Sequence, residues 1–167
     1  MAGGRRTDLR SKPQEQTRPI LGAHMSIAGG YHKAVERARE VGCDCVQIFT
    51  RNNTQWAAPP LTPEQSQRFR DTLARTAIGH PLAHSSYLIN LASPDAALWK
   101  KSIDAFVVEL QRAEEFGIPF VVVHPGSHTG AGVDAGLSRV VAALDEVHRQ
   151  TRGIRARCLL ENTAGQG

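Results

Sequence analysis

Short apolar runs alternate with longer amphipathic stretches along most of this chain. Runs of a few apolar residues recur at about 20–24, 45–49, 81–84, 120–124 and 158–161. The stretches between them carry apolar residues every three or four positions, which is the period of a helix with one buried face. The pattern therefore predicts five strands separated by four helices.

Capping residues mark where three of these helices begin or end. Gly42 follows a helix expected over 30–41 and suits the position just after a helix terminus. Thr62 can cap the second helix, and Gln65, three positions later, can complete a capping box. The segment Ser93-Pro94-Asp95 starts the third and longest helix.

Two helices carry long apolar stripes that we expect to face the core. The fourth helix is expected over about 133–148. The stripe residues are Trp99, Ile103, Phe106, Leu110 and Ala113 in the third helix, and Leu137, Val140, Val141, Leu144 and Val147 in the fourth. Near-continuous apolar strands are typical of a parallel sheet covered by helices, so the expected fold class is α/β. Periodicity does not separate an open doubly wound sheet from the first five strands of an eight-stranded barrel.

Composition fits one folded domain with a polar tail. Residues 1–18 are rich in Arg, Gln and Gly and are expected to be disordered, whereas 19–167 are expected to fold. The net charge of +4 is compatible with a polyanionic partner. No apolar run approaches the roughly 18 residues of a membrane span, so no membrane partner is expected.

Three cysteines, Cys43, Cys45 and Cys158, point to a reducing compartment. An odd count without a signal peptide predicts free thiols and a cytoplasmic location. Cys43 and Cys45 could be zinc ligands, but no second pair accompanies them. We favour their role as small core residues.

Three polar residues, His84, His124 and Glu161, end three of the apolar runs. In a parallel α/β barrel the carboxyl ends of the strands converge on the active site, and two histidines with one glutamate are a zinc ligand set. A lone histidine at a strand end is usually structural. A carboxylate that directly follows a buried strand, however, is costly unless it is paired or bound to a metal.

The loops that follow His124 and His84 carry further candidate site residues. The segment His124-Pro125-Gly126-Ser127-His128 is a rigid turn that carries two imidazoles, in which Gly126 permits tight backbone geometry. Beyond His84, Tyr87 and Leu88 either begin a hydrophobic loop cluster or form a wedge that enters a nucleic-acid duplex.

Taken together, these segments resemble the endonuclease IV family of apurinic/apyrimidinic endonucleases. The resemblance covers residues 20–167 and rests on the segments 22–30, 49–52, 55–56, 84–91, 124–128 and 161–167, of which the last two are specific signatures. It implies a (βα)8 TIM barrel, of which about the first five strands and four helices are present here.

The resemblance also implies site residues. His84, His124 and Glu161 would be zinc ligands, and Glu161 would bridge two ions as the catalytic carboxylate. The family holds up to three zinc ions, and ligands for about one are present here. The residues implied to contact DNA are Tyr87 and Leu88, which would enter the minor groove, and Ser26, Asn52 and Gln55. His24 and His128 would lie near the site in roles that stay open.

The implied activity is hydrolysis of the phosphodiester 5′ to an abasic site in duplex DNA, as in base excision repair, with zinc activating water and stabilising the leaving oxygen. This chain departs from the family pattern twice. It has Asn53-Thr54 where an Arg or Lys is frequent, and it lacks the Asp, His and Glu ligands of three further strands. We therefore expect the 167-residue chain to be an impaired nuclease.

Two other functions stay open at this point. A sugar isomerase or epimerase on a related barrel would use the same residue types to move a proton. A non-catalytic DNA-binding remnant is the second alternative. In either case, five parallel strands leave two unpaired sheet edges, which favour self-association.

Overall fold

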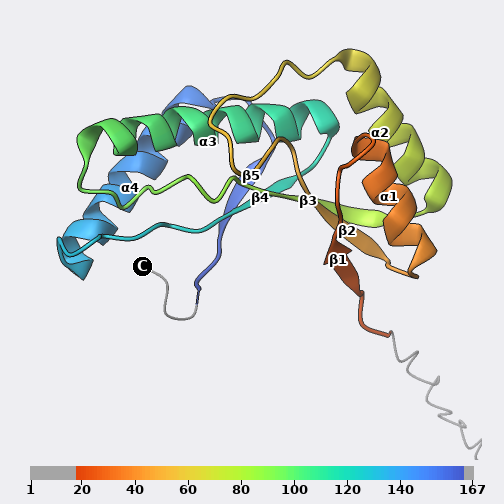
Figure 1. The fold of residues 1–167 in the computed structure, drawn as a ribbon, viewed down its shortest axis with the longest axis horizontal. Coiled ribbons are helices and arrows are strands. Elements are labelled where there is room, and N and C mark those ends of the chain that lie inside the picture. The colour runs from red at the N-terminus through yellow and green to blue at the C-terminus, as the bar shows by residue number, and fades with distance from the viewer. Residues whose placement is uncertain (1–17, 164–167) are drawn as a thin grey trace, which may run out of the picture.

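The computed structural model describes residues 18–163. The expected polar tail, apart from Arg18, and the last four residues of the motif that starts at Glu161 lie outside this range. The elements, in chain order, are β1 (Gly22–His24), α1 (Tyr31–Glu40), β2 (Cys45–Phe49), α2 (Pro63–Thr76), β3 (Gly79–His84), α3 (Ala96–Phe116), β4 (Phe120–Val123), α4 (Val133–Gln150) and β5 (Arg157–Leu160). The predicted alternation of strands and helices is confirmed (Figure 1).

The strands form one parallel sheet in the order β1-β2-β3-β4-β5. A doubly wound sheet would reverse its strand order at a switch point, and this sheet has no reversal over the described residues. Crossover connections between neighbouring parallel strands are right-handed in nearly all proteins, so helices that join strands in sequential order lie on one side of the sheet. The arrangement is that of a partial TIM barrel (Figure 1).

The helix boundaries follow from the capping residues. The Thr62 hydroxyl accepts a hydrogen bond from the backbone N–H of Gln65 at 3.3 Å, and the Gln65 side chain accepts one from the backbone N–H of Thr62 at 3.0 Å. This is the predicted capping box. Asp95 caps α3 by accepting from the backbone N–H of Leu98 at 2.7 Å. Gly42 has a φ of 78°, which a residue with a side chain rarely adopts, and it ends α1.

Helix α3 supplies the centre of the core. Its predicted stripe is confirmed for Ile103, Phe106, Leu110 and Ala113, which are buried, whereas Trp99 is only partly buried against the core. At its end, Phe116 packs edge-on against Tyr31 of α1 and Phe69 of α2, with ring centroids 4.6 and 5.2 Å away. These contacts fix the first three helices against one another.

Two expectations about burial are wrong. The strands at the two edges, β1 and β5, are mostly exposed, and Leu160 keeps 54% of its surface. In α4, Leu137 and Val141 are 59% and 60% exposed, although Val140 and Val147 are buried. The reason is shared: α4 packs on α3 through one face, and no element among residues 18–163 covers its other face or the outer edges of β1 and β5.

None of the helices described is long and apolar enough to cross a membrane.

Candidate metal centre and the loops around it

Three side chains from three neighbouring strands meet at the carboxyl edge of the sheet. His84 ends β3, and His124 and Glu161 directly follow β4 and β5. The Nε2 atoms of both histidines lie 3.1 Å from Oε2 of Glu161, and one ligand atom from each of the three residues lies within 4.8 Å of the others. The predicted convergence of these residues is confirmed by the geometry.

The tautomer of His84 is set by its neighbour. Nδ1 of His84 lies 2.8 Å from the backbone carbonyl of Ser85. A carbonyl oxygen only accepts, so Nδ1 carries a proton, and Nε2 is the ring nitrogen that faces the cluster. The two imidazoles, His84 first, lower the pKa of Glu161 below its ordinary value, so this group is a carboxylate at neutral pH. Each Nε2 atom lies 3.1 Å from a carboxylate oxygen, a separation that requires a cation between the two atoms, either a proton or a metal ion.

The donor set fits zinc. Ligand atoms around tetrahedral zinc, with bonds of about 2.0–2.1 Å, lie roughly 3.3 Å apart, close to the 3.1 Å separations here. This is the one group of three or more His, Cys, Asp or Glu side chains within residues 18–163 that could hold a metal. Cys43 and Cys45 are free thiols outside it, as is Cys158.

The cluster is buried on one side and open on the other. The side chain of His84 is 7% exposed, that of His124 is 29% exposed, and that of Glu161 is 47% exposed. The sequence argument that Glu161 follows a buried strand is therefore wrong, because β5 lies at the edge of the sheet. The contacts of Glu161 with the two imidazoles, and not its burial, hold its side chain at this position.

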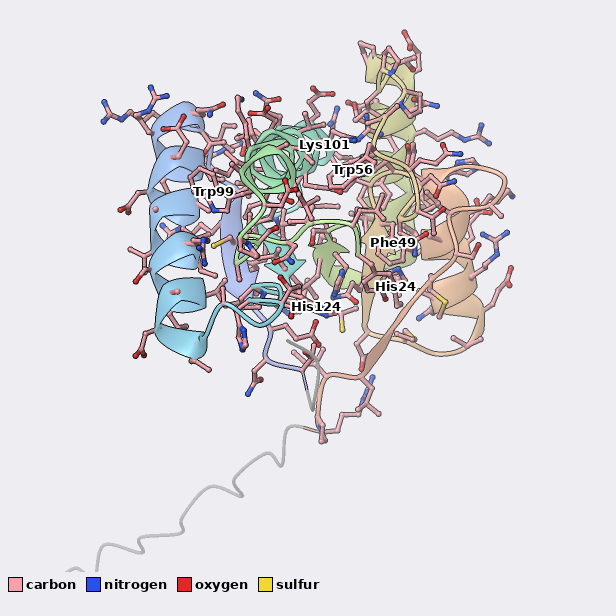
Figure 2. All side chains as sticks on the ribbon, turned by 60° about the vertical axis from the view of Figure 1, so that its left-hand side comes forward. His24, Phe49, Trp56, Trp99, Lys101 and His124 are labelled. Carbon is pink, nitrogen blue, oxygen red and sulfur yellow. The ribbon has the colours of Figure 1, made fainter. Side chains whose placement is uncertain are left out.

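Aromatic rings surround the cluster. The ring centroids of His24 and Phe49 are 4.3 Å apart, and Figure 2 shows the two side chains next to each other. The Phe49 ring lies 5.4 Å from that of Tyr87, which in turn lies 5.7 Å from that of His124. His24 contacts Gln47 through Nδ1 at 2.9 Å, and partial burial lowers its pKa, so it is neutral at pH 7. His24 is adjacent to the candidate metal centre without being one of its three residues.

The loop after His124 is fixed by Asn90. The Asn90 side chain donates to the backbone carbonyl of Ser127 at 2.9 Å and accepts from its N–H at 3.0 Å. A Cβ on Gly126 would lie 2.1 Å from the Asn90 oxygen, so only glycine permits this approach. The predicted role of Gly126 is confirmed, whereas Asn90 was not identified from the sequence.

His128 is turned towards its own loop. Its Nδ1 accepts from the backbone N–H groups of Gly130 and Gly132 at 3.2 and 3.3 Å. The ring therefore stabilises the start of α4 and is not part of the cluster of His84, His124 and Glu161. It also lines a groove of about 410 Å³ that extends from His124 along the start of α4 and includes Asn162.

The remaining predicted DNA contacts lie on loops at the same edge of the sheet. Ser26 follows β1, and Asn52 and Gln55 follow β2; all three are exposed. Tyr87 is 59% exposed and Leu88 is partly buried, so the tip of the loop after β3 points to solvent at Tyr87.

One polar residue beneath these loops was not identified from the sequence. Glu109 of α3 is fully buried, and both of its oxygens accept hydrogen bonds from loop residues. The sequence does contain a signal for it. A single carboxylate interrupts the apolar run 105–110 on the buried face of a helix, which is costly unless the group has partners.

Comparison with known protein families agrees with this architecture. Residues 35–167 match the family described as "Xylose isomerase-like TIM barrel". The chain is similar to a probable endonuclease 4 of Geobacter sp. strain M21, with 47% identity over 148 residues that cover 89% of this chain and 52% of that relative. A probable endonuclease 4 of Chloroflexus aurantiacus is 48% identical over 149 residues, again 89% of this chain and 52% of the relative. The chain thus spans about half the length of these curated relatives.

Solved structures give the same picture. Endonuclease IV from Thermus thermophilus superposes with a TM-score of 0.77 at 36% identity, covering 89% of this chain and 54% of that one. A 3-keto-D-glucoside 4-epimerase from E. coli superposes with a TM-score of 0.69 at 12% identity, over 89% of this chain and 58% of that one. The second likeness concerns the fold alone.

Proposed function

Because the chain belongs to the endonuclease IV family of xylose isomerase-like TIM barrels, we propose that its function is the zinc-dependent hydrolysis of the phosphodiester 5′ to abasic sites in duplex DNA, a step of DNA repair. The observation that carries this proposal is the cluster of His84, His124 and Glu161 directly beside the exposed Tyr87. This arrangement supports the proposal because residues that could hold a metal lie next to an aromatic side chain suited to stacking.

The three clustered residues would hold the metal. Zinc bound there would polarise a phosphate oxygen and lower the pKa of a bound water. The Ser85 carbonyl orients His84 so that its free nitrogen faces the cluster. Tyr87 covers one side of the cluster, since its ring lies 5.4 Å from that of His84. Glu161 is the proposed catalytic carboxylate, because it is the most exposed of the three and has a second oxygen for another metal ion.

The loops would hold the DNA. A net charge of +4 favours a polyanion, and Ser26, Asn52 and Gln55 are exposed where backbone contacts would form. Tyr87 would stack in the gap left by a missing base, with Leu88 beside it. Insertion costs less at an abasic site than in intact duplex, because one base stack is already lost.

The double change Tyr87→Ala with Leu88→Ala should lower the preference for abasic over intact duplex by about tenfold, since one aromatic stack on a base contributes about 1–3 kcal/mol. Salt-sensitive binding to the phosphates should stay largely unchanged. Titrations of labelled abasic and intact duplexes at two salt concentrations measure both quantities. The matched control is Ile20→Ala with Val41→Ala, which removes similarly exposed apolar side chains elsewhere. An equal loss of affinity for both duplexes would contradict the wedge and indicate a plain phosphate contact.

A sugar isomerase or epimerase is the second candidate. Several epimerases superpose on this chain at 12–19% identity, a likeness that shows the fold alone, so this candidate rests on the shared barrel. Zinc-loaded protein should bind abasic duplex in the presence of millimolar ketoses. Displacement of the DNA by a ketose would favour a sugar isomerase or epimerase.

The exposed apolar surface of the chain supports a proposal about partners. The outer edge of β5 and the α4 residues Leu137 and Val141 are uncovered over the described residues. The 167-residue chain should therefore self-associate as its concentration rises. Sedimentation should show a larger species for the unaltered chain than for Leu137→Lys with Val141→Lys. Weak apolar contacts form at concentrations of roughly 100 µM. If the unaltered chain and the variant are both monomeric at that concentration, the proposal of self-association is contradicted.

A further inference from the structure

A single buried carboxylate joins two of the loops proposed to contact DNA. Oε1 of Glu109 accepts from Nε of Arg51 at 2.8 Å and from the backbone N–H of Ser86 at 3.1 Å. Its Oε2 accepts from the hydroxyl of Thr50 at 2.6 Å. Thr50 and Arg51 begin the loop after β2, whereas Ser86 belongs to the loop after β3. Glu109 itself is 0% exposed and lies on α3.

Arg51 carries the connection to the outer part of its loop. Its Nη1 donates to the backbone carbonyls of Gln55 and Trp56, each at 2.8 Å. The Trp56 ring is in turn covered by Nζ of Lys101 from α3, 4.4 Å from the ring centroid (Figure 2). The loop that carries Asn52 and Gln55 is therefore held against α3 by two contacts. One is the buried pair of Arg51 with Glu109, and the other is Lys101 over the Trp56 ring.

Ser86 completes the connection on the other side. Its hydroxyl donates to the backbone carbonyl of Asn53 at 2.7 Å and accepts from the N–H of Leu88 at 3.3 Å. One chain of hydrogen bonds thus runs from the loop with Asn52 and Gln55 through Ser86 to the loop with Tyr87 and Leu88. A shift of either loop would break contacts in the other.

We propose that Glu109 and Arg51 are positioning residues, whose buried ion pair sets the placement of the Tyr87 loop relative to the Asn52 loop and thereby the discrimination of abasic from intact duplex. The inference rests on the proposed function. A buried ion pair adds little net stability over a well-packed apolar pair, so its use here is better explained by specificity of loop placement. Arg51 even leaves its Nη2 buried with no hydrogen-bond partner among the described residues.

The test uses two variants. The first carries both Arg51→Met and Glu109→Met, and the second carries Glu109→Gln alone. The double variant removes both charges together and should fold, whereas the single one leaves Arg51 buried without its counter-charge. The matched control is Asp104→Asn, a carboxylate on the same helix that forms an exposed pair with Lys100. All variants are made in a Trp99→Phe background, so that Trp56 is the sole tryptophan of the sequence.

Two readouts separate placement from stability. Quenching of Trp56 fluorescence by acrylamide reports the loop without any DNA, and its rate constant should rise about twofold or more in the double variant. The ratio of abasic to intact duplex affinity should fall about fivefold or more. Zinc content and a cooperative thermal transition should be retained, because neither residue is a metal ligand.

Each outcome decides a part of the inference. Unchanged quenching in a folded double variant overturns the connection between the loops. Increased quenching with an unchanged affinity ratio overturns the role in discrimination. If the unaltered protein shows no preference for abasic duplex, the proposed function fails and the discrimination role fails with it, while quenching still decides whether the ion pair places the loops. If only Glu109→Gln fails to fold, the double variant supplies the result.

Discussion

A chimera that continues this chain with the remaining strands of the Thermus thermophilus relative should cut abasic duplex at least about 100-fold faster than the 167-residue polypeptide. The first reason is the ligand count. Phosphodiester hydrolysis in a multi-metal site needs ions on both the attacking and the leaving oxygen. Residues 18–163 supply one cluster, in which Glu161 alone is placed to share an oxygen with a further ion.

The second reason is positional. Glu161 follows β5, whose outer edge has no neighbour among the described strands, and its side chain is 47% exposed. A displacement of about 1 Å in a catalytic group can cost ~100-fold in rate. A neighbouring strand paired with β5 would restrict Glu161 and raise the rate through geometry as well as through added ligands.

The measurement is cleavage of a labelled abasic duplex by both proteins with added zinc. A chelator should abolish cutting by the chimera, and the chimera with Glu161→Ala should be inactive although it keeps every added strand. Robust, chelator-sensitive cutting by the 167-residue polypeptide would mean that its own residues suffice. Inactivity of both proteins would favour the sugar enzyme or a non-catalytic DNA-binding protein.

Purified protein should hold about one zinc ion per chain, and His124→Ala should remove most of it. Each ligand supplies one of three donor atoms that lie within 4.8 Å of each other. Without the Nε2 atom of His124, the set falls to two protein donors, fewer than zinc sites in proteins normally have. Metal analysis after dialysis against a weak chelator measures the content, and His84→Ala and Glu161→Ala should behave in the same way.

Two neighbouring imidazoles provide the matched controls. His24→Ala and His128→Ala remove the same ring from positions beside the cluster, where His24 contacts Gln47 and His128 accepts from its own loop. Both variants should keep their zinc. If zinc content were unchanged in all three ligand variants, the metal site would lie elsewhere in the chain.

Local features of the fold could be predicted because their causes are local. The capping box of Thr62 and Gln65 involves residues three apart, and the helical stripe of α3 needs only the period of a helix. His84, His124 and Glu161 could also be proposed together, since the carboxyl ends of parallel strands always share one edge of the sheet.

Features that depend on neighbours distant in sequence could not be predicted from the sequence. Periodicity did not separate a barrel from a doubly wound sheet, because strand order is a property of the pairing and not of any one strand. Leu137 and Val141 have the sequence pattern of buried residues, yet their exposure depends on whether another element covers α4.

For this protein, the sequence by itself determined the elements, their order and the three residues of the candidate metal centre, because periodicity, caps and strand ends are encoded by neighbouring residues. Only the tertiary structure decided the tautomer of His84, the clamp of Asn90 on the loop after β4, and the burial of Glu109 between two loops. Each of these depends on a hydrogen-bond partner that the fold, not the local sequence, brings within reach.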